Sequence, residues 1–130
     1  MDKRFIEGTW EKGRAFSPAV IVKGGENMMF IAGHGGFVDD AGKSLAGDFD
    51  AQTRQTFRNI ERTLKEAGAA LKDLVTMTVF IADSRHGTRF TDLRREILVK
   101  EFPASALITC AGFARPEMMV EVQAIAMTGG

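Results

Sequence analysis

An α+β domain, with two helices on one face of a mixed sheet, is the fold class that this sequence predicts. In two segments the apolar residues recur at steps of three and four, which is the period of a helix. Short apolar runs bounded by glycines surround these segments and are typical of strands. No repeat or long linker divides the chain, so residues 1–130 are expected to form a single domain with the order β-β-α-β-α-β-β.

The first element that the sequence predicts is a β-hairpin. Two apolar runs, residues 19–23 and 27–32, lie on either side of Gly24-Gly25-Glu26. Apolar runs separated by a short glycine-containing segment are typical of two antiparallel strands joined by a tight turn. Further glycines at 33, 35, 36, 42 and 47 indicate that a loop follows the hairpin.

A helix is predicted from Asp50 to about Ala67. Its apolar positions fall on one helical face: Phe57, Ile60, Leu64 and Ala67. Asp48 or Asp50 can cap the start, because a short acidic side chain accepts hydrogen bonds from the free N–H groups of the first turn. Gly68 can end the helix, because glycine readily adopts the left-handed conformation found there.

The second half of the chain is expected to alternate strands with one more helix. Residues 74–82 carry apolar side chains on both faces, which indicates a central strand that is buried on both of its faces. A helix is predicted over about 88–100, and Phe102-Pro103 ends it. Its buried face holds Phe90, Leu93 and Ile97. Two strands and a turn complete the sheet, over about 105–111, 118–127 and 112–117.

If both helices cover the same face of the sheet, the other face is left open. The apolar residues expected on that open face are Leu74, Phe80, Leu107, Phe113, Met119 and Ile125. A monomer rarely exposes an apolar patch of this kind, so the chain is predicted to form a homo-oligomer.

Composition excludes several classes of protein. The 17 basic residues balance 17 acidic ones, and neither half of the chain holds a block of one sign, which argues against nucleic-acid partners. No apolar stretch approaches the ~20 residues of a membrane span, and the first seven residues lack a secretory signal. The single cysteine, Cys110, forms no disulfide framework, so the cytoplasm is the expected compartment.

Glu121 is the most informative candidate for chemistry. Strand alternation places it on one face with Met119, Gln123 and Ile125. The opposite face then carries Val120, Val122 and Ala124. A carboxylate among apolar neighbours loses part of its hydration, which suits it to proton transfer or to holding a water. The competing interpretation is a glutamate on an edge strand that faces solvent.

The histidines and the cysteine give weaker signals. His34 lies in Gly33-His34-Gly35-Gly36, which lacks the lysine and hydroxyl residue of a phosphate loop, so a glycine-rich turn with an exposed histidine is the simpler interpretation. His86 is expected at the surface, and Cys110 is expected to be a buried, inert thiol within a strand. These residues form no recognisable metal-ligand set, so no metal is predicted.

Several short segments, in their order and spacing, together resemble one known family. They include Phe16-Ser17-Pro18-Ala19-Val20, Phe30-Ile31-Ala32-Gly33-His34, Thr76-Met77-Thr78-Val79-Phe80, Phe102-Pro103-Ala104 and Val120-Glu121-Val122-Gln123-Ala124. From residue 16 almost to the C-terminus, the chain is similar to the Rid family, also called YjgF/YER057c/UK114. The resemblance implies a chorismate-mutase-like fold that assembles as a homotrimer, with clefts for a small-molecule substrate between subunits.

The resemblance also implies an activity, because members of this family hydrolyse reactive enamines and imines, such as 2-aminoacrylate, to a keto acid and ammonia. Glu121 matches the glutamate that positions water for attack on the imine carbon, and Gly33 matches a glycine that lines the cleft. No cofactor is expected. Three substrate-contacting positions depart from the common residue: Phe16 replaces tyrosine, His34 replaces glutamine, and Thr91 or Asp92 falls near an asparagine.

The most consequential departure from the family is at Ser105. Members of the family carry an arginine there, in a Pro-Ala-Arg-Ser segment, and this arginine binds the substrate carboxylate. A charge-assisted hydrogen bond contributes about 1.5–3 kcal/mol, so 2-aminoacrylate is not expected to be the natural substrate. Ser105 can still hydrogen-bond a smaller or neutral group. Arg115 could reach the cleft from another direction, although an arginine in a surface turn is the simpler interpretation.

Three functions remain open at this point. The first is a deaminase in which Glu121 guides water to a C=N carbon. The second is a non-catalytic trimer that binds a small metabolite in the cleft between subunits. The third, ribonuclease activity, is a label often attached to this family, and the neutral charge and the absence of tyrosine argue against it.

Overall fold

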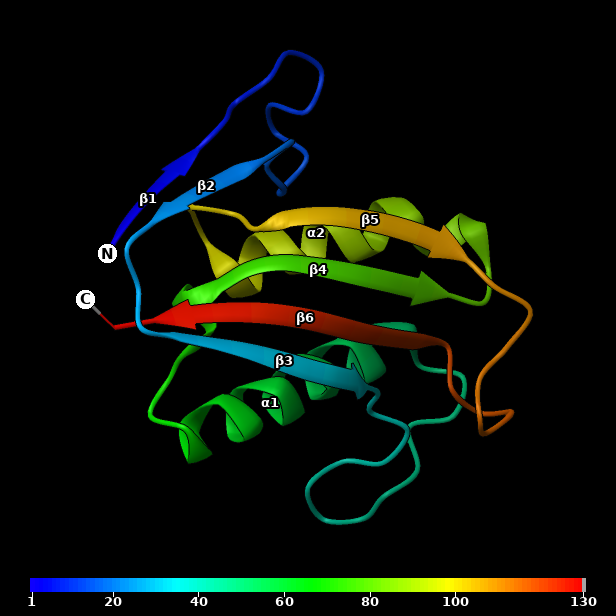
Figure 1. Ribbon diagram of the computed structural model, residues 1–130. Helices are drawn as coiled ribbons and strands as arrows, with labels where there is room; N and C mark the ends of the chain where they lie inside the picture. The colour runs from blue at the N-terminus through cyan, green and yellow to red at the C-terminus, as the bar shows by residue number, and fades with distance from the viewer. Residues whose placement is uncertain (130) are drawn as a thin grey trace.

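A four-stranded mixed sheet forms the centre of the molecule (Figure 1). The computed structural model describes residues 1–129. The strands of this sheet follow the order β3 (Asn27–His34), β6 (Val120–Thr128), β4 (Leu74–Ile81) and β5 (Ala104–Thr109). β4 and β5 run parallel, and the other two neighbouring pairs are antiparallel. The prediction of a mixed sheet with a central strand over 74–82 is therefore confirmed.

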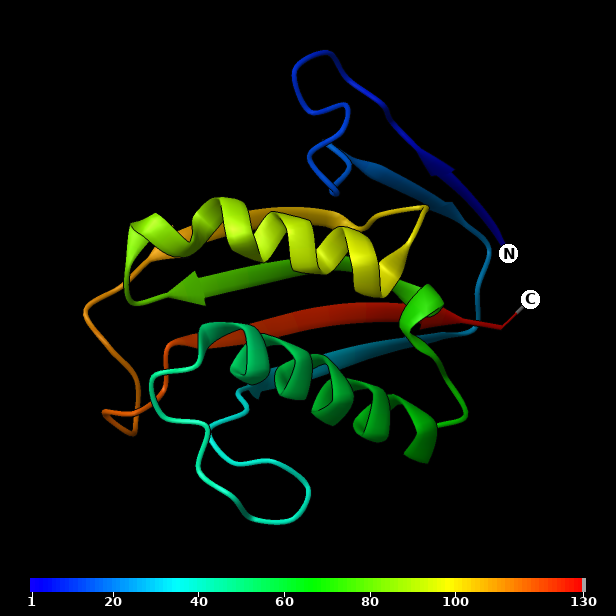
Figure 2. The same cartoon turned by 180° about the vertical axis from the view of Figure 1, so that it is seen from behind.

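Two helices cover one face of this sheet, as predicted (Figure 2). They are α1 (Phe49–Glu66) and α2 (Gly87–Leu98), and short 3-10 turns precede β4 and α2, η1 (Leu71–Asp73) and η2 (Ser84–His86). Of the two candidate caps of α1, Asp48 is the cap, because its carboxylate accepts a hydrogen bond from the Ala51 backbone N–H at 3.0 Å. Asp50 instead binds Arg89 of α2 at 2.6 Å and links the two helices.

The predicted hairpin between residues 19–23 and 27–32 is wrong, because its two strands belong to different sheets. β2 (Val20–Lys23) pairs with β1 (Asp2–Phe5) in a two-stranded sheet, whereas β3 pairs with β6. Gly24 and Gly25, with φ of 75° and 100°, carry the chain from one sheet to the other. β1 is an additional strand at the start of the predicted order, and its mostly charged sequence gives no apolar strand pattern.

One apolar core lies between the helices and the sheet. The sheet contributes the fully buried side chains of Val79, Ile81, Val120 and Val122. The helices contribute Phe57, Ile60, Leu64, Phe90 and Leu93. Because burial of each large apolar side chain contributes about 1.5–3 kcal/mol, these contacts fix the helices on this face. The predicted buried positions of both helices at these residues are confirmed, and Ile97 packs half-buried against the core.

The opposite face of the sheet is not covered by a helix within residues 1–129 (Figure 1). Phe80 and Ile125 lie on this open face as predicted, where Phe80 pairs with Ile108 and Ile125 pairs with Phe30. Phe30 is 76% exposed. Phe113 lies outside the sheet, in the loop between β5 and β6. The apolar residues of the open face are Met28, Phe30, Phe80, Ile108 and Ile125.

Three other residues predicted for the open face lie elsewhere. Leu74 is in the core, because the register with β6 shifts between Leu74 and Thr76 and interrupts the alternation of β4. Leu107 lies beside the buried Val79 in the register of β4 and β5, and therefore on the helix side of the sheet. Met119 precedes β6 and packs against the core.

Candidate active site

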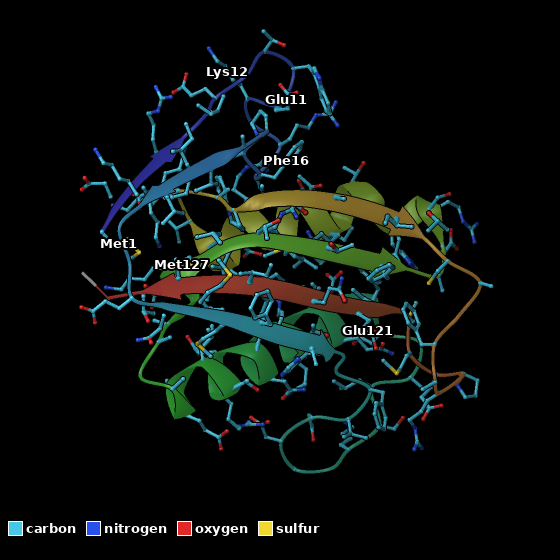
Figure 3. The ribbon with its side chains drawn as sticks, viewed as in Figure 1. Met1, Glu11, Lys12, Phe16, Glu121 and Met127 are labelled. Atoms are coloured by element: carbon cyan, nitrogen blue, oxygen red, sulfur yellow. The ribbon has the colours of Figure 1, made fainter. Side chains whose placement is uncertain are left out.

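Glu121 lies on the open face near the start of β6, close to the end of β3 (Figure 3). Its neighbours Val120 and Val122 are fully buried in the core, so strand alternation turns the Glu121 side chain to the other face. In the register with β4 it lies opposite Phe80. The side chain is half-buried. The competing interpretation of an edge strand is wrong, because β6 lies between β3 and β4.

Gly33 makes room for the Glu121 carboxyl group. A Cβ atom on Gly33 would lie 2.8 Å from Cδ and from Oε2 of Glu121, closer than side chains tolerate. The register of β3 with β6 shifts between Ile31 and His34, which brings Gly33 to this place. Within residues 1–129 the Glu121 carboxylate has no hydrogen bond or ion pair with another side chain. The acid is therefore free to bind a water or a ligand.

His34 does not join this acid. In the register it lies beside the buried Val122, so its ring is on the helix side of the sheet. Its Nδ1 atom lies 2.7 Å from the Ala32 carbonyl oxygen, to which it donates, and Nε2 lies 2.8 Å from the Thr63 hydroxyl of α1. The half-buried ring therefore attaches the end of β3 to α1, and the predicted exposed histidine is wrong.

A cavity on the helix side of β5 brings together three of the predicted site residues. It has a volume of about 560 Å³ and lies between α2, β5 and the loop that precedes β2. Its lining includes Phe16, Thr91 and Ser105, all predicted to contact substrate, together with Trp10, Arg94 and Leu107. We call it the Arg94 cavity. A volume of this size falls within the range of small-molecule sites.

Arg94 is the functional candidate that the sequence analysis missed. The residue is 2% exposed, and its Nη1 atom donates a hydrogen bond to the Ser105 hydroxyl at 2.7 Å. Its guanidinium carbon lies 5.1 Å from the ring centre of Phe90 and 5.8 Å from that of Phe16. A guanidinium group from α2 therefore lies beside Ser105. Arg94 falls four residues after Phe90, so its position on the buried helical face was visible in the sequence.

No carboxylate neutralises Arg94 within residues 1–129. Burial lowers the pKa of the Arg94 guanidinium to about 10, which still leaves it charged at neutral pH. Its Nε atom is buried without a hydrogen-bond partner in the described part of the chain. A buried cation normally has a partner that offsets its lost hydration. The cavity therefore contains a positive charge that no carboxylate of the described residues neutralises.

The sheet separates the two groups of candidate residues within one chain. Ser105 lies beside the buried Met77 in the register, and so faces the helices like Arg94. Glu121 and Gly33 lie at the open face. In Figure 3, Phe16 is seen beyond the outer side of β5, whereas Glu121 is near the start of β6. A site that uses both groups therefore needs a second copy of the chain.

Arg115 and Asp92 are engaged outside this cavity. Arg115 lies over the Phe37 ring at 4.4 Å and binds Glu117 at 2.8 Å, which holds the pKa of the Glu117 carboxyl below its usual value. Asp92 pairs with Arg95 on the exposed side of α2. Of the two positions proposed near the asparagine of the family, Thr91 is the one that lines the cavity.

The other histidine and the cysteine differ from their predicted settings. His86 is half-buried and stacks on Phe49, with 4.3 Å between ring centres, so it is not a surface residue. Cys110 follows the end of β5, in a half-buried position next to the loop rather than within the strand. Among residues 1–129, no three His, Cys, Asp or Glu side chains come together in a way that could hold a metal ion.

The fold and the site define a class of small α+β proteins with two helices on one face of a mixed sheet and an acid on the other. Residues 11–128 match the family model described as Endoribonuclease L-PSP. A RutC family protein of Pyrococcus horikoshii is 30% identical over 100 residues, 77% of this chain and 79% of its own. A RutC family protein of Pyrococcus abyssi is 29% identical over 77% and 78% of the two chains.

Two solved structures share the fold. The conserved Rid family protein YyfB of Yersinia pestis covers 98% of this chain and 100% of its own, with a TM-score of 0.84 at 24% identity. RidA from an Antarctic Psychrobacter covers 87% and 88%, with a TM-score of 0.72 at 27% identity. The chain therefore belongs to the Rid (YjgF) family, as its sequence motifs indicate. None of the helices in residues 1–129 has the length and apolar character that crossing a membrane requires.

The unpaired charge of Arg94 leads to a prediction about stability. In Arg94→Met a flexible apolar side chain of similar length replaces a buried cation, so the free energy of unfolding should be unchanged or higher by about 1–4 kcal/mol. Urea denaturation measures it. Arg89→Met, which removes an exposed pair with Asp50, is the control and should change stability by less than about 1 kcal/mol. A loss of more than about 2 kcal/mol in Arg94→Met would mean that the cation is a structural element.

Proposed function

We propose that this protein is a hydrolytic deaminase of a small reactive enamine or imine, converting C=N to a carbonyl group and ammonia. The observation that carries the proposal is Glu121, a half-buried carboxylate that packs against Gly33 and has no internal partner in residues 1–129. An acid in this state has a free oxygen with which to orient a water molecule. The reaction takes place in the cytoplasm, in single-domain subunits without a cofactor.

The chemistry needs one group that moves protons. Glu121 accepts a proton from water while the water oxygen bonds to the carbon of the protonated imine, which gives a neutral carbinolamine. The same carboxyl group returns that proton to nitrogen and then accepts the proton of the carbinolamine hydroxyl as the C–N bond breaks, so ammonia leaves and the carbonyl forms. An enamine first takes a proton on carbon to become the imine. Water supplies the oxygen of the product, so no oxidant or reductant is consumed.

The site is proposed to lie in a cleft between subunits of a homotrimer. Support comes from the open face, where Phe30 and Met28 are 76% and 55% exposed and Ile108 is 43% exposed. Monomers rarely leave such a surface uncovered. A neighbouring copy would cover it and could bring the Arg94 cavity of one subunit to Glu121 of the next. The trimer itself is taken from the resemblance to the Rid family.

The substrate is proposed to differ from 2-aminoacrylate. Ser105 replaces the arginine of the family, and Arg94, reaching it from α2, comes from a different element and so meets a substrate at a different angle. The cavity, with a volume of about 560 Å³, is also large enough for a ligand bigger than a three-carbon acid. Phe16 and Thr91 line it, as expected of substrate contacts.

The alternative function is binding of a small metabolite without turnover. It is favoured by the separation of Arg94 and Glu121 on opposite faces of the sheet, since a ligand in the cavity of a lone copy meets no catalytic acid. The name Endoribonuclease L-PSP belongs to the family model and suggests a third activity. A net charge of zero gives RNA no general attraction to this chain.

Replacing the acid tests the proposal. Glu121→Gln keeps the size of the side chain and removes its basicity, so ammonia release from imines of amino acids and from 2-aminomuconate should fall about 100-fold or more. Glu66→Gln, the same change at an exposed position, is the control and should retain full activity. Equal rates for wild type and Glu121→Gln would refute the catalytic role. Ligand-dependent thermal shifts without turnover would favour the binding protein, and Glu121-dependent RNA cleavage would favour the ribonuclease.

Gly33 provides a second test, because it changes the position of the acid and not its chemistry. In Gly33→Ala the new methyl group would lie 2.8 Å from the Glu121 carboxyl carbon, and the flexible glutamate must move away. A displacement of about 1 Å can lower turnover about 100-fold. Ammonia release measures this loss, and thermal unfolding should change little, because the end of one side chain absorbs the shift. Unchanged turnover would mean that the carboxylate does not act from this position.

A further inference from the structure

Arg94 has hydrogen-bonding capacity that the chain does not use. Its Nη1 atom donates to Ser105 and contacts the sulfur of Met77, whereas Nε and Nη2 have no acceptor within residues 1–129. The residue is 2% exposed and its Nε atom is buried, so bulk water reaches little of the guanidinium. A carboxylate is the group that best matches the planar donors of a guanidinium. This arrangement of donors therefore favours an anion as the ligand of the cavity.

The other charged residue of the cavity lining has the same sign of charge as Arg94. Arg14 supplies a second cation to the lining, and no aspartate or glutamate is among the residues that line it. Ser84, Thr88 and Thr91 also line this space, and the Thr91 hydroxyl donates a hydrogen bond to the Gly87 carbonyl at 3.2 Å. A concave surface with charges of one sign concentrates ions of the opposite sign. A neutral or cationic ligand would leave both arginines unpaired.

Two aromatic side chains line the cavity together with these cations. The rings of Trp10 and Phe16 meet edge to face, 5.9 Å apart, and both line the cavity. Trp10 is 65% exposed, although tryptophan is the side chain with the largest apolar surface to bury. The Gly13 carbonyl accepts a hydrogen bond from Arg95 of α2, and Ser17 binds Pro103 at 3.0 Å, so the loop is held at the cavity.

We propose that the Arg94 cavity binds the carboxylate of a planar, aromatic or conjugated organic acid, with Arg94 holding the carboxylate and Trp10 and Phe16 contacting the planar body. This inference deepens the proposed function by naming the class of substrate or product, and it rests on that function for the role of the ligand. Arg94 is here a specificity-determining residue: it selects the acid, and Glu121 acts on the C=N bond.

The test measures binding and needs no turnover. Trp10 is the single tryptophan of the chain, so its fluorescence reports on the occupation of this cavity. The probe is 3-phenylpropanoate, compared with propanoate, which lacks the ring, and with 3-phenylpropanamide, which lacks the charge. We expect saturable binding of 3-phenylpropanoate, with each comparison compound binding about 10-fold or more weakly. Equal affinity for the acid and the amide, or no saturable binding of the acid, would overturn the inference.

Two variants locate the effect. Arg94→Met should weaken binding of 3-phenylpropanoate about 10- to 100-fold and leave the weak binding of the amide unchanged. Arg58→Met removes a cation at an exposed position of α1 outside the cavity, and should leave the affinity for both compounds unchanged. Calorimetry on the wild-type protein measures the same affinity without relying on the fluorescence of Trp10. If Arg94→Met binds the acid as tightly as wild type does, the anion site is elsewhere.

The outcomes separate this inference from the proposed deaminase. Binding that depends on Arg94, without ammonia release from any imine, would support the acid site and refute the deaminase. Ammonia release that depends on Glu121 but is equally fast for imines with and without a carboxylate would support the deaminase and refute the acid site.

Discussion

The alternation of side chains along β6 is the constraint on which the candidate site depends. Val120, Val122 and Ala124 are buried under the helices, so the strand cannot slip by one residue without moving three apolar side chains out of the core. The same constraint holds Glu121 on the open face, beside a glycine whose lack of a side chain leaves space for the carboxyl group. The acid therefore gains its position from the core and needs no hydrogen bond of its own to remain there.

Unlike the position of Glu121, which follows from the packing of the core, the position of Arg94 is unfavourable for the stability of the fold. Burial of its charge is unfavourable, and the contacts with Ser105, Phe16 and Phe90 offset that cost in part, since a cation over an aromatic ring gains about 0.5–2 kcal/mol. An anionic ligand would supply the missing partner. Because the sheet lies between this cation and Glu121, the proposed site requires that the two surfaces meet across an interface between copies.

The sequence was sufficient to predict the elements that have strong local patterns. It was insufficient to predict which strands pair with one another across the fold. Both helices follow from their apolar spacing, and the direction of Glu121 follows from the alternation of its neighbours. The hairpin prediction failed because β2 pairs with β1, a polar strand that the apolar pattern does not reveal. Leu74 was misplaced by a register shift, and His34 by the strand pairing that turns it toward α1. Arg94 was overlooked because arginine is usually exposed, even where the helical period places it on the buried face.

The central claim is that a working site takes its cation from one copy and its acid from another, and mixing two inactive variants tests it most directly. Glu121→Gln and Arg94→Met subunits would be dissociated, combined in equal amounts and reassembled, with ammonia release measured afterwards. If the site forms between neighbours, random mixing restores both intact groups at about a quarter of the sites, and activity returns to about that fraction of wild type. If mixed oligomers form and remain as inactive as their parents, Arg94 and Glu121 do not act in a shared site between subunits.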